Sequence, residues 1–268
     1  MKRGRKKKKL NQIRLYLHNM KKIKILILAA GKGVRMQSEL PKALMPVKGK
    51  AMVRWLLEAV EKSGVDSRPI VIVGHQKENV IAELGDNPDY VEQKEQLGTG
   101  HAVMSAKERL KDQAENIMVL PSDHPFVSAA TIRTLAEKHI HSGSTITMAT
   151  ILLPDFEDWK AGFYKSFSRI VRDANGQILK DVQVKDASEE EKKITEVNPI
   201  YFCFKANWLW KNIQSLRTDN AQKEYYLTDL IRLAIQNGET IESVNIDPKE
   251  GLAANSKEEL EVLEKFAV

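Results

Sequence analysis

The stretch ILILAAGKGVRMQSELPKALMPV, residues 25–47, joins an apolar run to a loop that contains two glycines. The continuous apolar run Ile23–Ala29 is typical of a strand that is buried on both faces of a sheet. Gly31 and Gly33 follow it, and glycines allow backbone N–H groups to approach a phosphate closely. The stretch therefore predicts a phosphate-binding loop at the end of a first strand.

Two common phosphate-binding motifs do not fit this loop. A dinucleotide loop needs a third glycine and an acidic residue about twenty positions later, but the chain has Met36 and then the segment Met52–Trp55. A Walker A loop ends in Gly-Lys-Ser/Thr, which the segment GKGVRMQS lacks. The cations Lys32, Arg35 and Lys42 instead favour a highly charged ligand such as a triphosphate. A solvated basic loop is the plain alternative.

Charge is distributed unevenly along the 268 residues. Residues 1–19 contain eight Lys and Arg residues and no Asp or Glu, which leaves 34 basic and 36 acidic residues in the rest. We therefore expect no nucleic-acid binding by the main part of the chain. We interpret 1–19 as a basic leader that is disordered or not native, with a natural start at Met20 and one domain over 20–268. A nucleic-acid or membrane tether is the alternative function of the leader.

The composition favours neither membrane insertion nor a disulfide framework. No apolar run approaches the roughly eighteen residues that span a bilayer, and the single cysteine, Cys203, lies in an apolar stretch. A lone cysteine cannot build a disulfide framework. We expect a cytoplasmic protein with no membrane partner, and the sequence leaves the oligomeric state open.

Apolar periodicity predicts alternating strands and helices in the first half of the chain. Strands are expected at 23–29, 69–74, 89–93, 116–121 and 145–153, with helices at 52–60, 77–84, 99–111 and 128–141 between them. This order is typical of an α/β protein with a Rossmann-like, doubly wound, mostly parallel sheet.

The pattern changes in the second half. Two strand-like runs flank Asn175-Gly176, which is the strongest short signal for a β-hairpin. We expect a β-hairpin insertion from about 155 to 205 that forms one wall of a cleft. The remaining elements are expected to be a strand at 195–204, a helix at 225–238, a strand at 240–246 and a final helix that Ser256 caps.

Four segments resemble one known family in their order along the chain. The stretch LAAGKGVRMQSELPKALMPVKGKAMV (28–53) resembles the N-terminal signature of sugar-phosphate nucleotidylyltransferases, and most of all the bacterial UDP-N-acetylglucosamine pyrophosphorylase domain. The segments EQLGTGHAV (95–103), VLPSDHPF (119–126) and NAQKEYYLTDLI (220–231) resemble its base-recognition loop, its metal element and a later motif. The resemblance covers 23 to about 265.

The resemblance implies a fold of the nucleotide-diphospho-sugar transferase type and a reaction. The domain would transfer a nucleotide from an NTP, by analogy UTP, to a sugar 1-phosphate, with Mg²⁺ as cofactor. The acceptor would be N-acetylglucosamine 1-phosphate or a related hexose phosphate. No hexapeptide repeat follows the last helix, so we expect no acetyltransferase activity.

The resemblance also implies roles for individual residues. Arg35 and Lys42 would be the catalytic cations that hold the triphosphate and the acceptor phosphate. The nucleotide would contact the phosphate-loop residues Ala30, Gly31 and Gly33 and the base-recognition residues Gln93, Gly98 and Thr99. Asp123 and Asn255 would bind Mg²⁺.

The position of Asp123 agrees with a metal role. It follows the predicted strand at 116–121, and ligands bind at the carboxyl ends of strands in open α/β sheets. A carboxylate with one amide oxygen suits Mg²⁺, which keeps waters and binds substrate phosphates. A helix N-cap is the alternative, but the next predicted helix begins five residues later. We interpret His101 and His124 as hydrogen-bonding residues, because no second His or Cys lies at ligand spacing.

The acceptor side departs from the family pattern. Ser168 replaces a glycine, Gln183 replaces a glutamate, and Asn198 is kept but is followed by Pro199. We expect Ser168, Gln183 and Asn198 to bind the acceptor and these changes to alter its identity. Two alternatives stay open: a cytidylyl- or guanylyltransferase that acts on another phosphate, and a non-catalytic sugar-nucleotide-binding protein.

Overall fold

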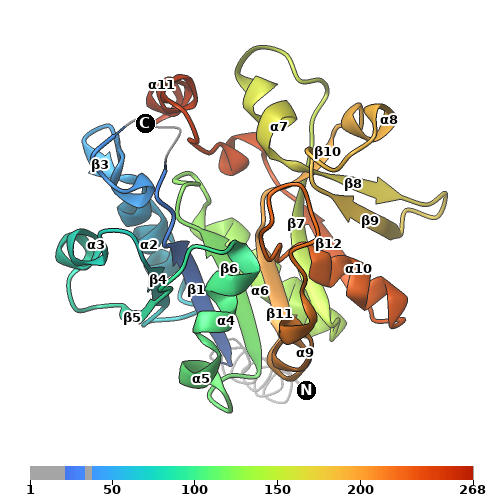
Figure 1. Ribbon diagram of the computed structural model, residues 1–268, viewed down its shortest axis with the longest axis horizontal. Helices are drawn as coiled ribbons and strands as arrows, with labels where there is room; N and C mark the ends of the chain where they lie inside the picture. The colour runs from blue at the N-terminus through green and yellow to red at the C-terminus, as the bar shows by residue number, and fades with distance from the viewer. Residues whose placement is uncertain (1–21, 34–37, 268) are drawn as a thin grey trace, which may run out of the picture.

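The computed structural model describes residues 22–33 and 38–267, and within them the expected α/β fold is confirmed. In this part of the chain ten strands form one sheet in the order β5-β4-β1-β6-β11-β7-β10-β8-β9, with β12 beside β7. Helices lie on both sides of the sheet (Figure 1). Three expectations concern residues outside the described ones and stay predictions. They are the basic leader at 1–19, the natural start at Met20 and the catalytic role of Arg35.

The strands and helices of the first half lie close to their predicted positions. The bounds of all strands and helices are as follows. The strands of the large sheet are β1 (Ile23–Ala29), β4 (Ile70–Val73), β5 (Asp89–Glu92), β6 (Asn116–Pro121), β7 (Ile146–Leu152), β8 (Ser168–Arg172), β9 (Ile178–Val182), β10 (Glu196–Asn198), β11 (Phe202–Lys205) and β12 (Ile241–Asn245). The short strands β2 (Pro46–Val47) and β3 (Lys50–Ala51) pair with each other. The helices are α2 (Met52–Ser63), α3 (Lys77–Leu84), α4 (Thr99–Ser105), α5 (Lys107–Leu110), α6 (Ala129–Ser142), α7 (Ala161–Ser166), α8 (Glu189–Lys192), α9 (Ala206–Asn212), α10 (Asp229–Gln236) and α11 (Lys257–Phe266).

The sheet buries a separate apolar core on each face. Ile25 and Ile27 of β1 belong to the core that α2 and α6 cover, whereas Leu26 belongs to the core that α4 and α10 cover. This alternation is what a strand buried on both faces requires. The strands β5, β4, β1 and β6 are parallel neighbours, so their carboxyl ends meet at one edge. The glycine loop leaves β1 at this edge.

The second half of the sheet is antiparallel, so the sheet as a whole is mixed. Strand β11 runs antiparallel to both β6 and β7, and β10, β8 and β9 continue as antiparallel neighbours. Only β12 returns to a parallel pairing, with β7. Short turns suffice to join antiparallel strands, whereas a parallel pair needs a long crossover. The expectation of a mostly parallel sheet therefore holds for the first half alone.

The predicted β-hairpin is present as β8 and β9, which pair on either side of Asn175-Gly176. Gly176 has a φ of 79°, a conformation that glycine adopts without strain. Together with α7, α8 and β10 the hairpin forms a layer at the upper right of Figure 1, beyond the end of the main sheet. The expected insertion between about 155 and 205 is therefore a real structural unit, and it also contains two helices that the sequence did not predict.

The strand predicted at 195–204 is two strands, β10 and β11, separated at residues 199–201. Both strands pair with β7. Strand β11 pairs with the start of β7, and β10 pairs with the end of β7. Pro199 has no N–H for a ladder hydrogen bond, and Ile200 has a φ of 65°, which a strand cannot accommodate. The break interrupts the sheet where the main sheet meets the hairpin layer.

Two predicted helices differ in extent from the observed ones. The helix predicted at 99–111 is divided at Ala106 into α4 and α5. The helix predicted at 225–238 begins only at Asp229, because Tyr225 donates its N–H to Leu97 and accepts from Gly100 instead of joining a helix. No helix in the described part of the chain is both long enough and apolar enough to cross a membrane.

Candidate active site

A cavity of about 600 Å³ opens at the carboxyl ends of β1 and β6, between the main sheet and the hairpin layer. Every predicted site residue that the structure describes lines it: Ala30, Gly31, Gly33, Lys42, Gln93, Gly98, Thr99, Asp123, Ser168, Gln183, Asn198 and Asn255. These residues come from nine separate stretches of the chain. Their convergence makes this cavity the candidate active site, while the role of each residue stays a proposal.

The glycine loop lies against the short 3₁₀ helix Lys42–Leu44 (η2), which follows Pro41. Gly33 has a φ of 64°, and a Cβ on it would lie 2.9 Å from the Cβ of Lys42. A side chain at this position would therefore be strained and would also push Lys42 away. The second glycine of the loop is thus required for the close approach of the lysine.

Lys42 connects the two predicted metal ligands. Its Nζ donates hydrogen bonds to Oδ2 of Asp123 and, at 2.6 Å, to Oδ1 of Asn255. The Lys42 and Asp123 side chains are only 19% and 15% exposed. Burial alone would raise the pKa of Asp123, but the adjacent Lys42 ammonium holds that pKa below its usual range. Asp123 is therefore ionised beside a resident cation.

Asn255 is held in place from the start of α11. Ser256 caps this helix by accepting a hydrogen bond from the N–H of Glu259, as the sequence predicts. The Glu259 carboxylate accepts from the N–H of Asn255 at 2.5 Å rather than from that of Ser256. The helix start therefore fixes the backbone that carries the Asn255 side chain toward Lys42.

These residues fit a magnesium ion. The Lys42 ammonium lies where a carboxylate oxygen and an amide oxygen converge, so the same two oxygens can face a divalent cation. Among the described residues, no three His, Cys, Asp or Glu side chains gather in a way that could hold a metal. A site with so few protein ligands suits Mg²⁺, which keeps several waters and accepts substrate phosphates as further ligands.

His124 is a buried hydrogen-bonding residue, as interpreted from the sequence. Its Nδ1 lies 2.9 Å from the hydroxyl of Tyr201, and that hydroxyl donates its proton to the carbonyl of Glu250 at 2.6 Å. Nδ1 must therefore carry the proton of the imidazole and donate it to Tyr201. Burial lowers the pKa of His124 to about 4, although the Asp123 charge opposes this. His124 is a neutral donor that anchors the loop after β6.

The base-recognition loop is tied to the later motif at 220–231. Gly98 has a φ of 105°, and a Cβ there would lie 2.8 Å from the carbonyl oxygen of Tyr225. Thr99 accepts a hydrogen bond from the N–H of Leu227 at 3.0 Å, which leaves its hydroxyl proton for a ligand. Gln93 donates to the carbonyl of Gly98 at 3.2 Å. The two motifs that resemble the family thus form one packed unit.

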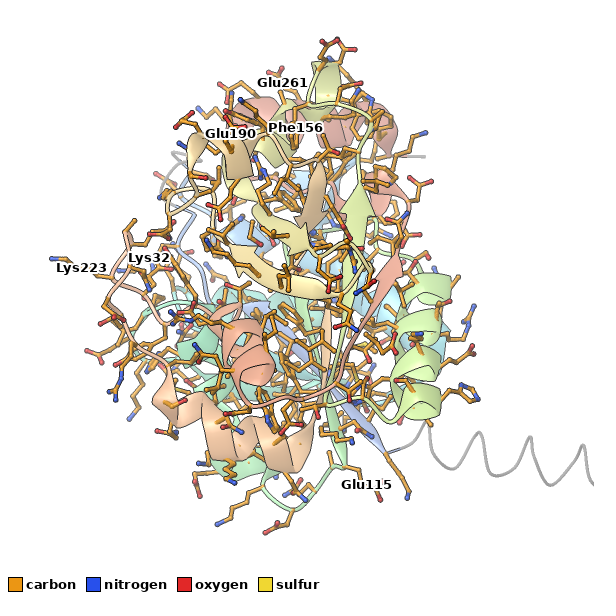
Figure 2. All side chains as sticks on the ribbon, turned by 90° about the vertical axis from the view of Figure 1, so that its right-hand side faces the viewer. Lys32, Glu115, Phe156, Glu190, Lys223 and Glu261 are labelled. Carbon is orange, nitrogen blue, oxygen red and sulfur yellow. The ribbon has the colours of Figure 1, made fainter. Side chains whose placement is uncertain are left out.

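His101 and the segment around Lys223 add to this unit. The Nδ1 of His101 lies 3.1 Å from Nε2 of Gln93, so the histidine orients the glutamine, as a hydrogen-bonding residue should. Gln222 and Glu224 line the cavity although no role was predicted for them. Lys223, which separates them in the sequence, lies on the same left-hand side of the molecule in Figure 2 as Lys32 of the glycine loop. Glu115, directly before β6, lies at the bottom of Figure 2, away from these two lysines.

The acceptor-side residues lie on the hairpin layer. Ser168 of β8 and Asn198 of β10 are register neighbours, and Gln183 directly follows β9. The Nε2 of Gln183 donates to the hydroxyl of Thr228 at 3.0 Å. The insertion therefore walls the cavity opposite the glycine loop. The sequence prediction missed Lys165, which also lines this wall, because nothing in the sequence indicated helix α7.

The buried side chain of Arg169 connects several parts of this wall through hydrogen bonds. Its guanidinium is fully buried and donates to the carbonyls of Phe167, Tyr164 and Lys192. Tyr164 and Phe167 lie at the end of α7 and Lys192 is the last residue of α8, so this one side chain of β8 joins three elements of the insertion. Burial lowers the pKa of Arg169, but an arginine remains charged. A buried charge satisfied by several carbonyls leaves little freedom in the turn that carries Ser168.

The fold has a close counterpart among solved structures. A Bacillus anthracis protein described as a glucose-1-phosphate thymidylyltransferase, in complex with sucrose, superposes with a TM-score of 0.73. The match covers 91% of this chain and 95% of that chain at 16% sequence identity. At this identity the likeness shows the fold alone.

Sequence comparison finds relatives over most of the chain. The bifunctional protein GlmU of Carboxydothermus hydrogenoformans is 40% identical over 241 residues, which are 90% of this chain and 52% of that protein. The bifunctional protein GlmU of Desulfotalea psychrophila is 38% identical over 238 residues, which are 88% of this chain and 68% of that protein. A family model described as the MobA-like NTP transferase domain matches residues 25–221.

The fold, the site and these likenesses together define a nucleotidyltransferase, as the sequence indicated. More particularly, the chain belongs to the family of MobA-like NTP transferase domains. The predicted resemblance to sugar-phosphate nucleotidylyltransferases is confirmed as well. The chain spans about half the length of the first relative that it matches, so that relative's full activity does not transfer to it.

Proposed function

We propose that this chain catalyses the Mg²⁺-dependent transfer of UMP from UTP to a sugar 1-phosphate. The acceptor is N-acetylglucosamine 1-phosphate or a related hexose phosphate, and the products are a UDP-sugar and pyrophosphate. The observation that carries the proposal is one cavity that contains the glycine loop, the Lys42–Asp123–Asn255 cluster and a polar wall. Such a cavity can bring two phosphates together while the wall binds a sugar.

The chemistry of the acceptor explains the catalytic residues that are needed. A phosphate monoester has a second pKa of about 6, so a sugar 1-phosphate is largely a dianion at neutral pH. Its oxygen can attack the α-phosphorus of the NTP in line without a general base. Catalysis then consists of positioning two anions and stabilising the charge that develops between them. Among the described residues, the only histidine that lines the cavity is His124, which is neutral and already hydrogen bonded.

Lys42 is the residue placed to offset repulsion between the two phosphates. Its ammonium lies at the end of the glycine loop and is already inside the cavity. Magnesium bound at Asp123 and Asn255 would supply further neutralising charge to the phosphates. When these oxygens face a metal, the ammonium is left to interact with phosphate oxygens. Arg35 is proposed to assist it, from a loop segment outside the described residues.

The choice of UTP rests on the base-recognition side of the cavity. The segment EQLGTG matches the resembled family without change, and three of its residues, Gln96, Gly98 and Thr99, line the cavity beside Gln93. The glutamine amide is oriented by His101 and by the Gly98 carbonyl. A fixed amide can discriminate between bases through hydrogen bonds, because a wrong base leaves polar groups unpaired.

The proposal is tested by an assay of each of the four NTPs with several sugar 1-phosphates. The measured quantity is the rate of pyrophosphate release. UTP with an N-acetylhexosamine or hexose 1-phosphate should give the fastest release, and chelation of Mg²⁺ should abolish it. The variants Lys42→Met and Asp123→Asn should each lose at least about 100-fold in kcat/KM, since removal of one electrostatic group at a reacting phosphate has effects of this order. Lys62→Met, an exposed lysine on α2, is the matched control and should not change the rate.

Other outcomes of this assay would select the alternatives. A preference for CTP or GTP would identify a cytidylyl- or guanylyltransferase. Binding of a UDP-sugar without Mg²⁺, together with no pyrophosphate from any pair, would identify a binding protein without turnover. The cytoplasmic location predicted from the single cysteine remains part of the proposal.

A further inference from the structure

Asp181 of β9 is a carboxyl group directly behind the acceptor wall. Its Oδ2 accepts a hydrogen bond from Nδ2 of Asn198 at 2.5 Å. Its Oδ1 is buried and has no hydrogen-bond partner among the described residues, and the same is true of the hydroxyl oxygen of Ser168. Asn198 and Ser168 both line the cavity, whereas Asp181 does not. The carboxyl therefore acts on the cavity only through its neighbours.

No described lysine or arginine forms an ion pair with Asp181. Burial raises the pKa of its carboxyl to about 7, Ser168 and Asn198 oppose the rise, and Asp229 of α10 adds to it. Asp229 itself has only a distant cation, Arg232, at 4.0 Å. Burial of a carboxylate without a neighbouring cation costs free energy of folding, so the contacts that Asp181 makes need an explanation. Its one strong contact is the amide of Asn198.

The Asn198 amide is held at both ends. Its Nδ2 donates to Asp181, and its Oδ1 accepts from the N–H of Ile200 at 2.7 Å. The Ile200 N–H can only donate, so the amide oxygen faces it, and Oδ2 of Asp181 accepts from the amide nitrogen; the two contacts agree on a single orientation. The carbonyl oxygen is used by the backbone, and what remains for a ligand is the second hydrogen of Nδ2. Asn198 therefore offers the cavity a donor.

Gln183 offers the complementary group. Its Nε2 donates to the hydroxyl of Thr228, which leaves its Oε1 as an acceptor on the same wall. The wall then carries one fixed donor and one acceptor, both neutral. This pair suits a neutral sugar substituent that has both an oxygen acceptor and an O–H or N–H donor. It does not suit a sugar that carries a charged amine or carboxylate there.

We propose that Asp181 is a positioning residue that sets acceptor specificity by holding the Asn198 amide with its N–H toward the sugar. This inference rests on the proposed function, because it presumes a sugar phosphate on this wall. The donor at position 198 then recognises an oxygen substituent of the sugar ring, and Gln183 recognises a neighbouring O–H or N–H.

Asp181→Asn tests the proposal with little change of shape. An amide at position 181 can accept or donate, so it no longer restrains the Asn198 amide, which is then held in its orientation by the Ile200 N–H alone. The KM for the sugar 1-phosphate should rise about tenfold, which corresponds to the upper range for a single hydrogen bond. The KM for UTP and kcat should stay within about twofold. Glu190→Gln, an exposed carboxylate on α8 of the same insertion, is the matched control and should change neither.

A series of deoxy sugar 1-phosphates separates recognition from general damage. In the wild-type chain one deoxy analogue should lose about tenfold in kcat/KM relative to its parent sugar, and in Asp181→Asn this ratio should fall toward one. The ratio is measured within each variant, so it does not depend on the fraction that is folded. An unchanged ratio, or an equal loss toward UTP and the sugar, would overturn the positioning role. Absence of turnover with every sugar phosphate in the wild-type chain would instead refute the proposed function.

Discussion

Lys42→Met should destabilise the metal-free protein because it leaves the Asp123 carboxylate without its cation. Both side chains are more than four-fifths covered, and the lysine also bonds to Asn255. Removal of one partner from a buried pair costs about 3–5 kcal/mol. Partial exposure and the remaining hydrogen-bond donors favour the lower end, about 3 kcal/mol. For a domain of this size that is a fall in Tm of about 6–12 °C.

Thermal unfolding in the presence of a chelator measures this effect, and a double variant tests its cause. Lys42→Met combined with Asp123→Asn should recover at least half of the lost stability, since an amide is far less costly to bury than an unpaired charge. Lys62→Met should shift Tm by less than about 2 °C, as expected of an exposed lysine. Addition of Mg²⁺ should stabilise Lys42→Met more than the wild-type chain, because Asp123 has lost its competing cation.

Two results would refute this reasoning. If Lys42→Met left Tm unchanged in chelator, the contact between Lys42 and Asp123 would not be an energetically important pair. If the double variant lost as much stability as the two single variants added together, the two side chains would act independently. Either result would also remove the argument that Asp123 and Asn255 face a common cation.

The remaining predictions concern other parts of the cavity. The folded pKa of about 7 at Asp181 exceeds the ordinary 3.8, so the wild-type chain holds a proton that the unfolded chain releases. The stability that this group contributes is present at low pH and is lost as the pH rises from about 4 to about 7. Urea unfolding at pH 5 and pH 8 should therefore show a smaller decrease in the free energy of unfolding between the two pH values in Asp181→Asn than in the wild-type chain. Gly98→Ala should raise the KM for UTP at least about tenfold with little effect on that of the sugar phosphate, because a Cβ meets Tyr225. Arg169→Met should lower Tm by several degrees in a melting assay, since the carbonyls it caps stay buried, while UTP binding by calorimetry should persist.

The glycine loop and Asp123 could be placed at the cavity from the sequence because each follows a buried strand. The glycine loop directly follows an apolar strand, and the end of a buried parallel strand is where a phosphate loop belongs. Asp123 was placed by the same argument from β6. The contact between Lys42 and Asp123 also follows, since β1 and β6 are adjacent in the sheet. Local pattern was sufficient to place these two segments, whereas Gln93, Gly98, Thr99 and Asn255 were named from the family resemblance, and the roles of all these residues stay proposals.

The acceptor wall could not be predicted in the same way because it depends on register. Asp181 meets Asn198 only because β8 pairs with β9 on one side and with β10 on the other. No periodic pattern in the sequence encodes those two registers. Helices α7 and α8 were missed because each is no longer than six residues, which is too short for an apolar repeat to emerge. Their positions depend on tertiary contacts such as the carbonyls that Arg169 holds.

The interruption between β10 and β11 shows how the departure at Pro199 contributes to the wall. Ile200 is a β-branched residue with a φ of 65°, a conformation that costs about 1–3 kcal/mol. The strain places its N–H on the Asn198 oxygen at 2.7 Å, which a regular strand would have directed into the sheet ladder. Pro199 makes the interruption tolerable, since it has no N–H to lose. The sequence indicated only that Pro199 is one of the departures on the acceptor side that alter the identity of the acceptor. The geometry instead assigns it to the turn that orients Asn198, so the altered residues of this wall act together rather than as separate substitutions.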